Sequence, residues 1–158
     1  MPGDLPMYYW DACVPLAYIQ NEEERAHLVE AMLNEAEDKR YELFTSVLSV
    51  TEVAFVEKEK ATGQLDPAAL DRIDSLWHPP SPLMLVEYFP QIAVGARDLI
   101  RESVSRNWSL KPPDAIHLAT ARHLQVEWFH SYDEKLEKWG ELLGFKVGEP
   151  QPFQVPLV

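Results

Sequence analysis

The sequence has 158 residues and a single cysteine, Cys13, so no disulfide can form within the chain. No CxxC pair is present to hold zinc, and neither a glycine-rich phosphate loop nor a GxSxG serine motif occurs. No apolar run reaches the length of a membrane span, and the N-terminus lacks the basic and then apolar pattern of a targeting signal. These absences predict a cytoplasmic protein with no membrane segment.

Basic residues are also few, with 14 Lys and Arg against 26 Asp and Glu and a net charge of −12. Proteins that bind nucleic acid by neutralising phosphates are usually basic over the contact face, so this charge argues against broad attraction to nucleic acid. The acid excess lies mostly in residues 1–96, whereas the basic residues of 97–158 balance the acids there. Any face that contacts phosphate is therefore expected to draw on residues 97–158.

The length and the apolar content, 46% of residues, are those of one globular domain with one hydrophobic core. We expect a single domain over residues 1–149. The proline-rich segment 150–158 is expected to form a tail that lies irregularly on the surface.

Short apolar segments alternate with helical patterns along the chain. The predicted strands are residues 7–10, 41–44, 83–86, 126–129 and 145–147. The predicted helices are residues 14–19, 22–39, 50–61, 91–105, 112–121 and 133–143, with one more that begins at Asp66 and Pro67. Parallel neighbouring strands need long crossovers, so this order predicts an α/β fold with a central, mostly parallel sheet of four to five strands and helices on both faces.

Four acidic residues near these boundaries each have a local explanation. Asp11 stands where a helix N-cap would stand. Ser49 and Glu52 fit a capping box, in which the glutamate reaches back to a backbone amide. Asp114 lies in a first helical turn, where the helix dipole favours an acid. Asp133 lies within a second capping-box pattern.

The positions of the four acids suggest a shared site. Asp11 and Asp133 directly follow predicted strands, and Glu52 and Asp114 lie in the first turns of predicted helices. In a parallel sheet these positions share the carboxyl edge, where such folds bind ligands. Crowded carboxylates stay ionised only with a compensating cation, and oxygen ligands favour Mg²⁺ or Mn²⁺ over zinc. The chemistry that such a pocket predicts is phosphodiester hydrolysis by a metal-activated water.

Four segments of the chain resemble the motifs of the PIN-domain family, in the family's order. The segment Pro113-Asp114-Ala115-Ile116-His117-Leu118-Ala119-Thr120-Ala121 is similar to the family's Asp-Ala-x-His-Leu-Ala-x-Ala helix and is the most specific match. The other three segments resemble an apolar strand ending in Asp, a serine-led helix with a Glu, and a serine two residues before an Asp; they are residues 8–16, 46–53 and 131–136.

The resemblance implies an α/β/α sandwich that cleaves RNA or single strands with Mg²⁺ or Mn²⁺, as the VapC-type toxins of bacterial toxin–antitoxin pairs do. It implies that the metal-site acids are Asp11, Glu52, Asp114 and Asp133. It also implies supporting hydrogen-bonding roles for Ser131 and for Ser46 or Ser49. The implied partners are an RNA substrate, an antitoxin protein and a second copy of the chain.

Two other classes of protein compete with a ribonuclease. A PIN-like binding module could keep the fold without cleaving RNA and act through a protein partner. A receiver-like signalling domain would also hold Mg²⁺ at its strand ends, but it needs paired acids near the first strand, a phosphoacceptor Asp after a middle strand and a Lys after a later one, and the sequence lacks this set. A phosphatase with an aspartyl nucleophile would need a second acid two residues after the first, but Asp11 is followed by Ala12 and Cys13. His117 either orients Asp114 or packs in the core, and Cys13 is assigned to packing.

Overall fold

The computed structural model describes residues 4–153, and its five strands form one sheet in which every neighbouring pair is parallel. The strand order is β3-β2-β1-β4-β5. The strands are β1 (Met7–Trp10), β2 (Glu42–Ser46), β3 (Leu83–Val86), β4 (Trp128–His130) and β5 (Lys146–Gly148). The predicted α/β fold with a parallel sheet is confirmed. All five predicted strands are present, and each of their ends lies within two residues of its predicted position.

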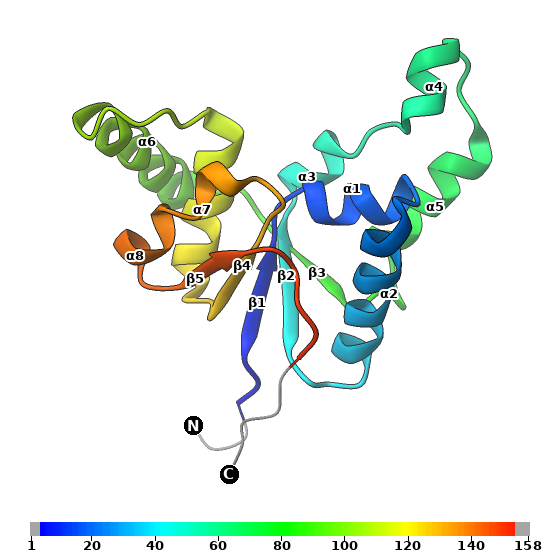
Figure 1. Cartoon of the computed structure of the whole chain (residues 1–158), viewed down its shortest axis with the longest axis horizontal. Helices are drawn as coiled ribbons and strands as arrows, with labels where there is room; N and C mark the ends of the chain where they lie inside the picture. Colours follow the sequence, from blue (N-terminus) through cyan, green and yellow to red (C-terminus); the bar gives the residue numbers. More distant parts are fainter. Residues whose placement is uncertain (1–3, 154–158) are drawn as a thin grey trace.

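Helices cover both faces of the sheet (Figure 1). On one side lie α1 (Cys13–Ile19), α2 (Glu23–Glu37) and α5 (Pro67–Trp77), and on the other lie α6 (Pro90–Ser105), α7 (Pro112–Leu124) and α8 (Trp139–Leu143). The remaining helical elements are α3 (Leu48–Glu52), α4 (Glu57–Thr62), which projects from the body, and the 3₁₀ turn η1 (Glu134–Leu136). Within residues 4–153, no helix is long and apolar enough to cross a membrane.

Strand β1 shows how the sheet joins two cores. Successive side chains of a strand point to opposite faces. Tyr8 and Trp10 pack with α1, α2 and α5, and Tyr9 packs with α6, α7 and α8. Because Tyr9 and Trp10 have no exposed surface, β1 is buried on both faces, as central strands of parallel sheets are.

The helix predicted over residues 50–61 is wrong, because the chain leaves the helix after Glu52 and begins α4 at Glu57. Val53 and Val56 are both buried in the core between these helices. The Glu59 carboxylate accepts a hydrogen bond from Val56 N at 3.0 Å, which starts a new helix there. Glu52 is therefore the last residue of α3, and the prediction that it lies in a first turn is also wrong.

The helix predicted over residues 133–143 is also wrong, because it is divided into η1 and α8. Leu136 and Trp139 are both buried in the same core, and the chain bends between them to place both side chains there. Gly140 lets α8 pack closely, since a Cβ at this position would lie 2.7 Å from the carbonyl oxygen of Phe145. Tertiary packing outweighs the helical pattern of this segment.

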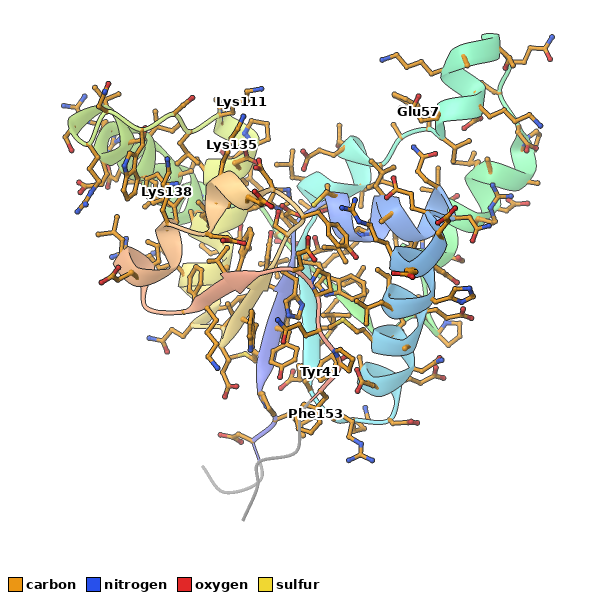
Figure 2. The ribbon with its side chains drawn as sticks, viewed as in Figure 1. Tyr41, Glu57, Lys111, Lys135, Lys138 and Phe153 are labelled. Carbon is orange, nitrogen blue, oxygen red and sulfur yellow. The ribbon has the colours of Figure 1, made fainter. Side chains whose placement is uncertain are left out.

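The C-terminal segment is irregular through Phe153, as far as the structure describes it. Phe153 N donates to the Glu35 carboxylate at 3.0 Å, and its ring lies 6.0 Å from that of Tyr41 (Figure 2). The start of the predicted tail is therefore anchored beside α2. Residues 154–158 of that tail lie outside the described residues.

Candidate active site

The four predicted acids meet at the carboxyl edge of the sheet, where α1, α3 and the first turn of α7 also lie (Figure 1). Asp11 follows β1, and Glu52 ends the helix that follows β2. Asp114 lies in the first turn of α7, and Asp133 lies between β4 and η1. Electrostatic repulsion links the four carboxylates, because Asp114 interacts with each of the other three.

Asp11 is buried, with only 5% of its surface exposed. Its Oδ1 accepts hydrogen bonds from the Cys13 thiol at 2.7 Å and from Cys13 N at 3.2 Å, and its own N–H donates to His130 O. Burial raises the pKa of Asp11, and hydrogen bonds from Cys13 and Ser131 oppose that rise. These donors support the ionised carboxylate at a place where water is largely excluded.

Cys13 links two loops of the site. Its sulfur donates to Asp11, accepts a hydrogen bond from Tyr132 N at 3.3 Å, and lies 3.5 Å from Ser131 Oγ. Burial, followed by the charge of Asp11, raises the pKa of the thiol far above its usual range, so the sulfur stays protonated. The assignment of Cys13 to packing was therefore incomplete, and its position two residues after Asp11 was the one available signal.

Glu52 is held by a chain of hydrogen bonds on the side of the sheet that α6, α7 and α8 cover. His117 Nε2 lies 2.6 Å from Glu52 Oε1, and His117 Nδ1 lies 2.7 Å from the hydroxyl of Tyr9. Ser46 N donates to that same hydroxyl at 3.0 Å. Because a carboxylate only accepts, Nε2 carries a proton and donates to Glu52.

Of the two hypotheses for His117, the structure supports packing in the core and not the orientation of Asp114. The ring is 98% buried, since its exposed fraction is 2%, and its hydrogen bond reaches Glu52. Within residues 4–153, His117 and Asp114 share no hydrogen bond. Tyr9 is a residue of this arrangement that the sequence did not single out, because an apolar strand position carries no sign that its hydroxyl reaches a histidine 108 positions away.

Asp114 differs from the other acids in its lack of partners. It is half-buried, and among residues 4–153 its carboxylate has neither a hydrogen bond nor a salt bridge. Burial raises its pKa, repulsion from Asp133 and Glu52 adds to the rise, and His117 and Lys111 oppose it. The site therefore holds a carboxylate that neighbouring protein groups compensate only in part.

The two predicted supporting serines lie in different places. Ser131 lies among the acids, where its Oγ accepts from Asp133 N at 3.0 Å. Ser49 instead pairs with Thr45 at 2.6 Å inside the fold. The predicted capping box of Ser49 and Glu52 does not form, because Ser49 is buried within α3 and Glu52 is bound to α7.

The donors left free for a cation are carboxylate oxygens. Both ring nitrogens of His117 have hydrogen-bond partners, and the Cys13 thiol is protonated. Within the described residues, no three His, Cys, Asp or Glu side chains form a group that could by itself hold a metal ion. The free carboxylate oxygens suit Mg²⁺ or Mn²⁺, because Mg²⁺ keeps several waters and binds through one or two carboxylates together with substrate phosphate. Zinc sites usually include nitrogen or sulfur ligands, and those of His117 and Cys13 are already engaged.

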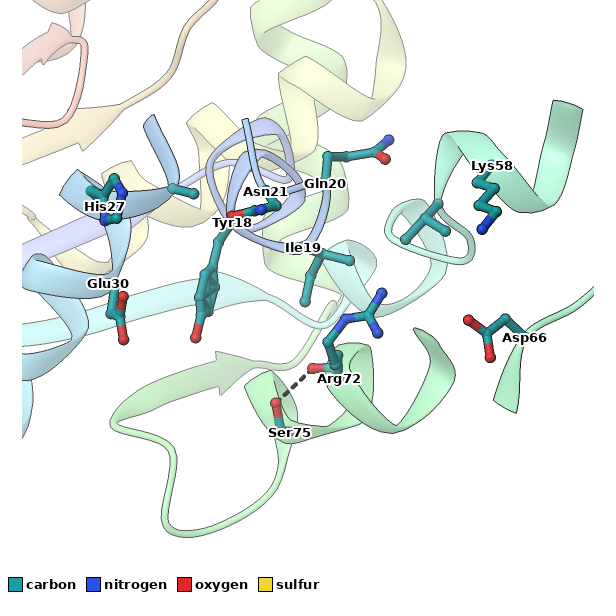
Figure 3. Close-up of a pocket in the computed structure, with 12 residues that line it drawn as sticks. Tyr18, Ile19, Gln20, Asn21, His27, Glu30, Lys58, Asp66, Arg72 and Ser75 are labelled. Atoms are coloured by element: carbon teal, nitrogen blue, oxygen red, sulfur yellow. Dashed lines mark hydrogen bonds between the residues drawn. The ribbon is translucent and has the colours of Figure 1, made fainter. Parts of the chain in front are cut away.

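A separate hollow of about 610 Å³ opens beside α1, α2, α4 and α5 (Figure 3). Its walls carry both signs of charge, including Glu30, Lys58, Asp66 and Arg72. None of the four acids lines it, so the candidate active site and this hollow are distinct.

Comparisons with known proteins agree with the fold. A family model described as the PIN domain matches residues 8–142. The structure of VapBC2 from Rickettsia felis bound to a DNA fragment from their promoter is similar, with a TM-score of 0.64 and 10% identity, covering 89% of this chain and 96% of that one. FitAcB from Neisseria gonorrhoeae is similar with a TM-score of 0.62 and 12% identity, covering 91% of this chain and 98% of that one. No curated protein sequence matches. Since the family model spans most of the sequence, the chain belongs to the PIN-domain family.

Proposed function

We propose that this protein is an Mg²⁺- or Mn²⁺-dependent ribonuclease that hydrolyses RNA phosphodiester bonds. The observation that carries the proposal is the half-buried Asp114 carboxylate, which lacks a hydrogen-bonding or salt-bridge partner among the described residues and faces Asp133 and Glu52. Such a group calls for a cation to offset its charge. A hydrolase of this class uses water as its nucleophile, so it needs no activated side chain of the kind that Cys13 fails to provide.

Each acid has a proposed role. Asp11, Asp114 and Asp133 would hold the cation directly or through water, and Glu52 would hold the cation or its water. A divalent cation bound there supplies a Lewis acid for the phosphodiester and lowers the pKa of an attacking water. His117 keeps one oxygen of Glu52 turned toward α7, and Ser131 fixes the backbone of Asp133. The protein's own contribution is to hold these oxygens before the substrate arrives.

The test is cleavage of fluorescent single-stranded RNA by the purified chain with Mg²⁺ or Mn²⁺, with EDTA, and with Asp114→Asn. Metal-dependent cleavage that Asp114→Asn abolishes supports the proposal. Asp98→Asn removes the same charge from an exposed pair with Arg97 and serves as the control. A folded wild type that cleaves no RNA with either metal favours the alternative, a PIN-like module that binds without cleaving.

We further propose that the chain acts as the toxin of a toxin–antitoxin pair in the cytoplasm. Its support is the likeness of the fold to VapBC2 and FitAcB. An antitoxin would insert a basic side chain among the acids, because a cation there replaces the metal's charge and blocks the substrate. The chain would also form a homodimer, and size-exclusion chromatography with light scattering tests this by measuring its mass in solution. A protein encoded beside this gene that suppresses RNA cleavage would identify the partner.

A further inference from the structure

The flank of the candidate site formed by α7, η1 and α8 carries three lysines. Lys111 precedes α7, Lys135 lies in η1, and Lys138 precedes α8. All three are exposed, and Figure 2 shows them on this side of the molecule, across from Glu57 on α4. We call these three residues the lysine flank.

The lysine flank adjoins the acids. The charge of Lys111 acts on Asp114, where it opposes the rise in pKa. Lys135 N donates to the Asp133 carboxylate at 3.0 Å, and the two residues are only two positions apart. Because Asp114 and Asp133 also interact with each other, both lysines stand beside one acidic site.

Lys138 extends the flank outward. Its ammonium lies 4.8 Å from the centre of the Trp108 ring, and the guanidinium of Arg106 lies 5.2 Å from the same ring. A cation over an indole ring is held there by electrostatic attraction. Arg106 is also paired with Glu102 at 2.7 Å, whereas Lys138 has no carboxylate partner among residues 4–153. Trp108 thus contacts a cation that forms no salt bridge in the described part of the chain.

None of the three lysines forms a salt bridge in the described part of the chain, although the charge of the whole protein is −12. Residues 97–158 hold eight Lys and Arg against nine Asp and Glu, while residues 1–96 hold six against seventeen. On α4, Lys58 and Lys60 alternate with Glu57 and Glu59. The lysine flank differs from α4 in its place beside Asp114 and Asp133.

We propose that the lysine flank binds the phosphate backbone of a single RNA strand as it leaves the acidic site. The inference deepens the proposed ribonuclease function and rests on it for the identity of the strand. The position of Lys138 over Trp108 sets the outer end of the path.

The test is fluorescence anisotropy of a labelled 12-nucleotide single-stranded RNA bound to the full chain in EDTA, over a range of KCl concentrations. Each phosphate contact to a single strand contributes about 0.7 to the slope of log affinity against log salt. We expect the double variant Lys135→Gln, Lys138→Gln to weaken binding and to lower that slope by about 1.4. The matched control, Lys58→Gln with Lys60→Gln on α4, also removes two charges and should leave the slope unchanged.

The outcomes separate this inference from the proposed function. An unchanged slope in the flank variant, or no RNA binding by the wild type, overturns the lysine flank even if RNA is cleaved. Lysine-dependent binding without any metal-dependent cleavage supports the flank and removes the ribonuclease. Equal competition by polyglutamate of the same charge would instead assign the flank to an acidic protein segment and would overturn the RNA assignment.

Discussion

His117 Nε2 lies 2.6 Å from Glu52 Oε1, so a buried histidine of α7 holds the acid that ends α3. The two residues are 65 positions apart in the sequence. Tyr9 holds the other side of the ring, and Ser46 N fixes the Tyr9 hydroxyl. The orientation of Glu52 therefore depends on groups inside the core, as the orientation of metal-binding side chains commonly does.

Replacing His117 should weaken the binding of the cation. We expect His117→Ala to lower Mn²⁺ affinity by roughly 10- to 100-fold, because outer partners of metal ligands have effects of this size. Tyr9→Phe removes only the hydroxyl and should have a smaller effect of the same sign. Calorimetric titration with Mn²⁺ measures both.

The conservative variant His117→Gln distinguishes positioning from folding. Its amide nitrogen can donate to Glu52 in place of Nε2, so it should recover part of the affinity lost in His117→Ala. Equal Mn²⁺ affinity in the wild type and in a folded His117→Ala protein would show that His117 does not position a metal ligand.

Asp114→Asn should stabilise the folded protein at neutral pH. The pKa of Asp114 is raised on folding, so its ionised form opposes folding. The stability that comes from protonated Asp114 is fully present below the unfolded pKa and is lost as pH rises through the folded pKa. Removing the charge should raise the Tm at pH 7 by about 2–4 °C for each kcal/mol of repulsion relieved. The gain should vanish near pH 3, and calorimetry with Asp98→Asn as the control checks it. A lower Tm at pH 7 would contradict the proposed repulsion.

The Cys13 thiol should resist alkylation in the native protein. Its raised pKa leaves almost no thiolate at pH 8, and the thiolate is the reactive form. We expect iodoacetamide to react at least about a hundredfold more slowly than in the unfolded chain. Mass spectrometry gives an unambiguous readout because the chain has one cysteine. Equal rates in native and unfolded protein would refute the hydrogen-bonded, protonated thiol.

His130 should make the fold sensitive to mild acid. Burial lowers its pKa from 6.5 to about 3, and its Nδ1 accepts from Trp10 Nε1 at 3.2 Å. Because the folded pKa lies below the unfolded one, the stability from neutral His130 is full above pH 6.5 and is lost as pH falls toward 3. The loss is at most about 1.4 kcal/mol per pH unit.

Urea unfolding between pH 7 and 4 measures this dependence. His130→Asn keeps an acceptor near Trp10 but cannot be protonated, so its free energy of unfolding should fall less steeply with acid than that of the wild type. Parallel curves for the two proteins would assign the acid sensitivity to other groups.

The sequence determined the order of the elements and the edge at which the site forms. Strand and helix periodicities along the chain lead to one parallel sheet, because parallel strands need helical crossovers. Asp11, Asp114 and Asp133 come together because each stands where a strand ends or where a helix begins, and those positions coincide in such a sheet.

Local pattern was insufficient where burial governed the backbone. The helical periodicity of residues 50–61 and 133–143 was interrupted because Val53, Val56, Leu136 and Trp139 all had to reach the core. The capping box of Ser49 and Glu52 failed for a related reason, since each side chain found a partner on another element.

Only the tertiary structure decided which groups hold the acids in place. The hydrogen bonds of Glu52 with His117, and of Cys13 with Tyr132, join residues 65 and 119 positions apart. Such pairs leave no periodic mark in the sequence, because periodicity records which face of an element is buried and says nothing about which distant side chain lies opposite. The chain's pattern placed the carboxylates at one edge, and packing of the two cores oriented them.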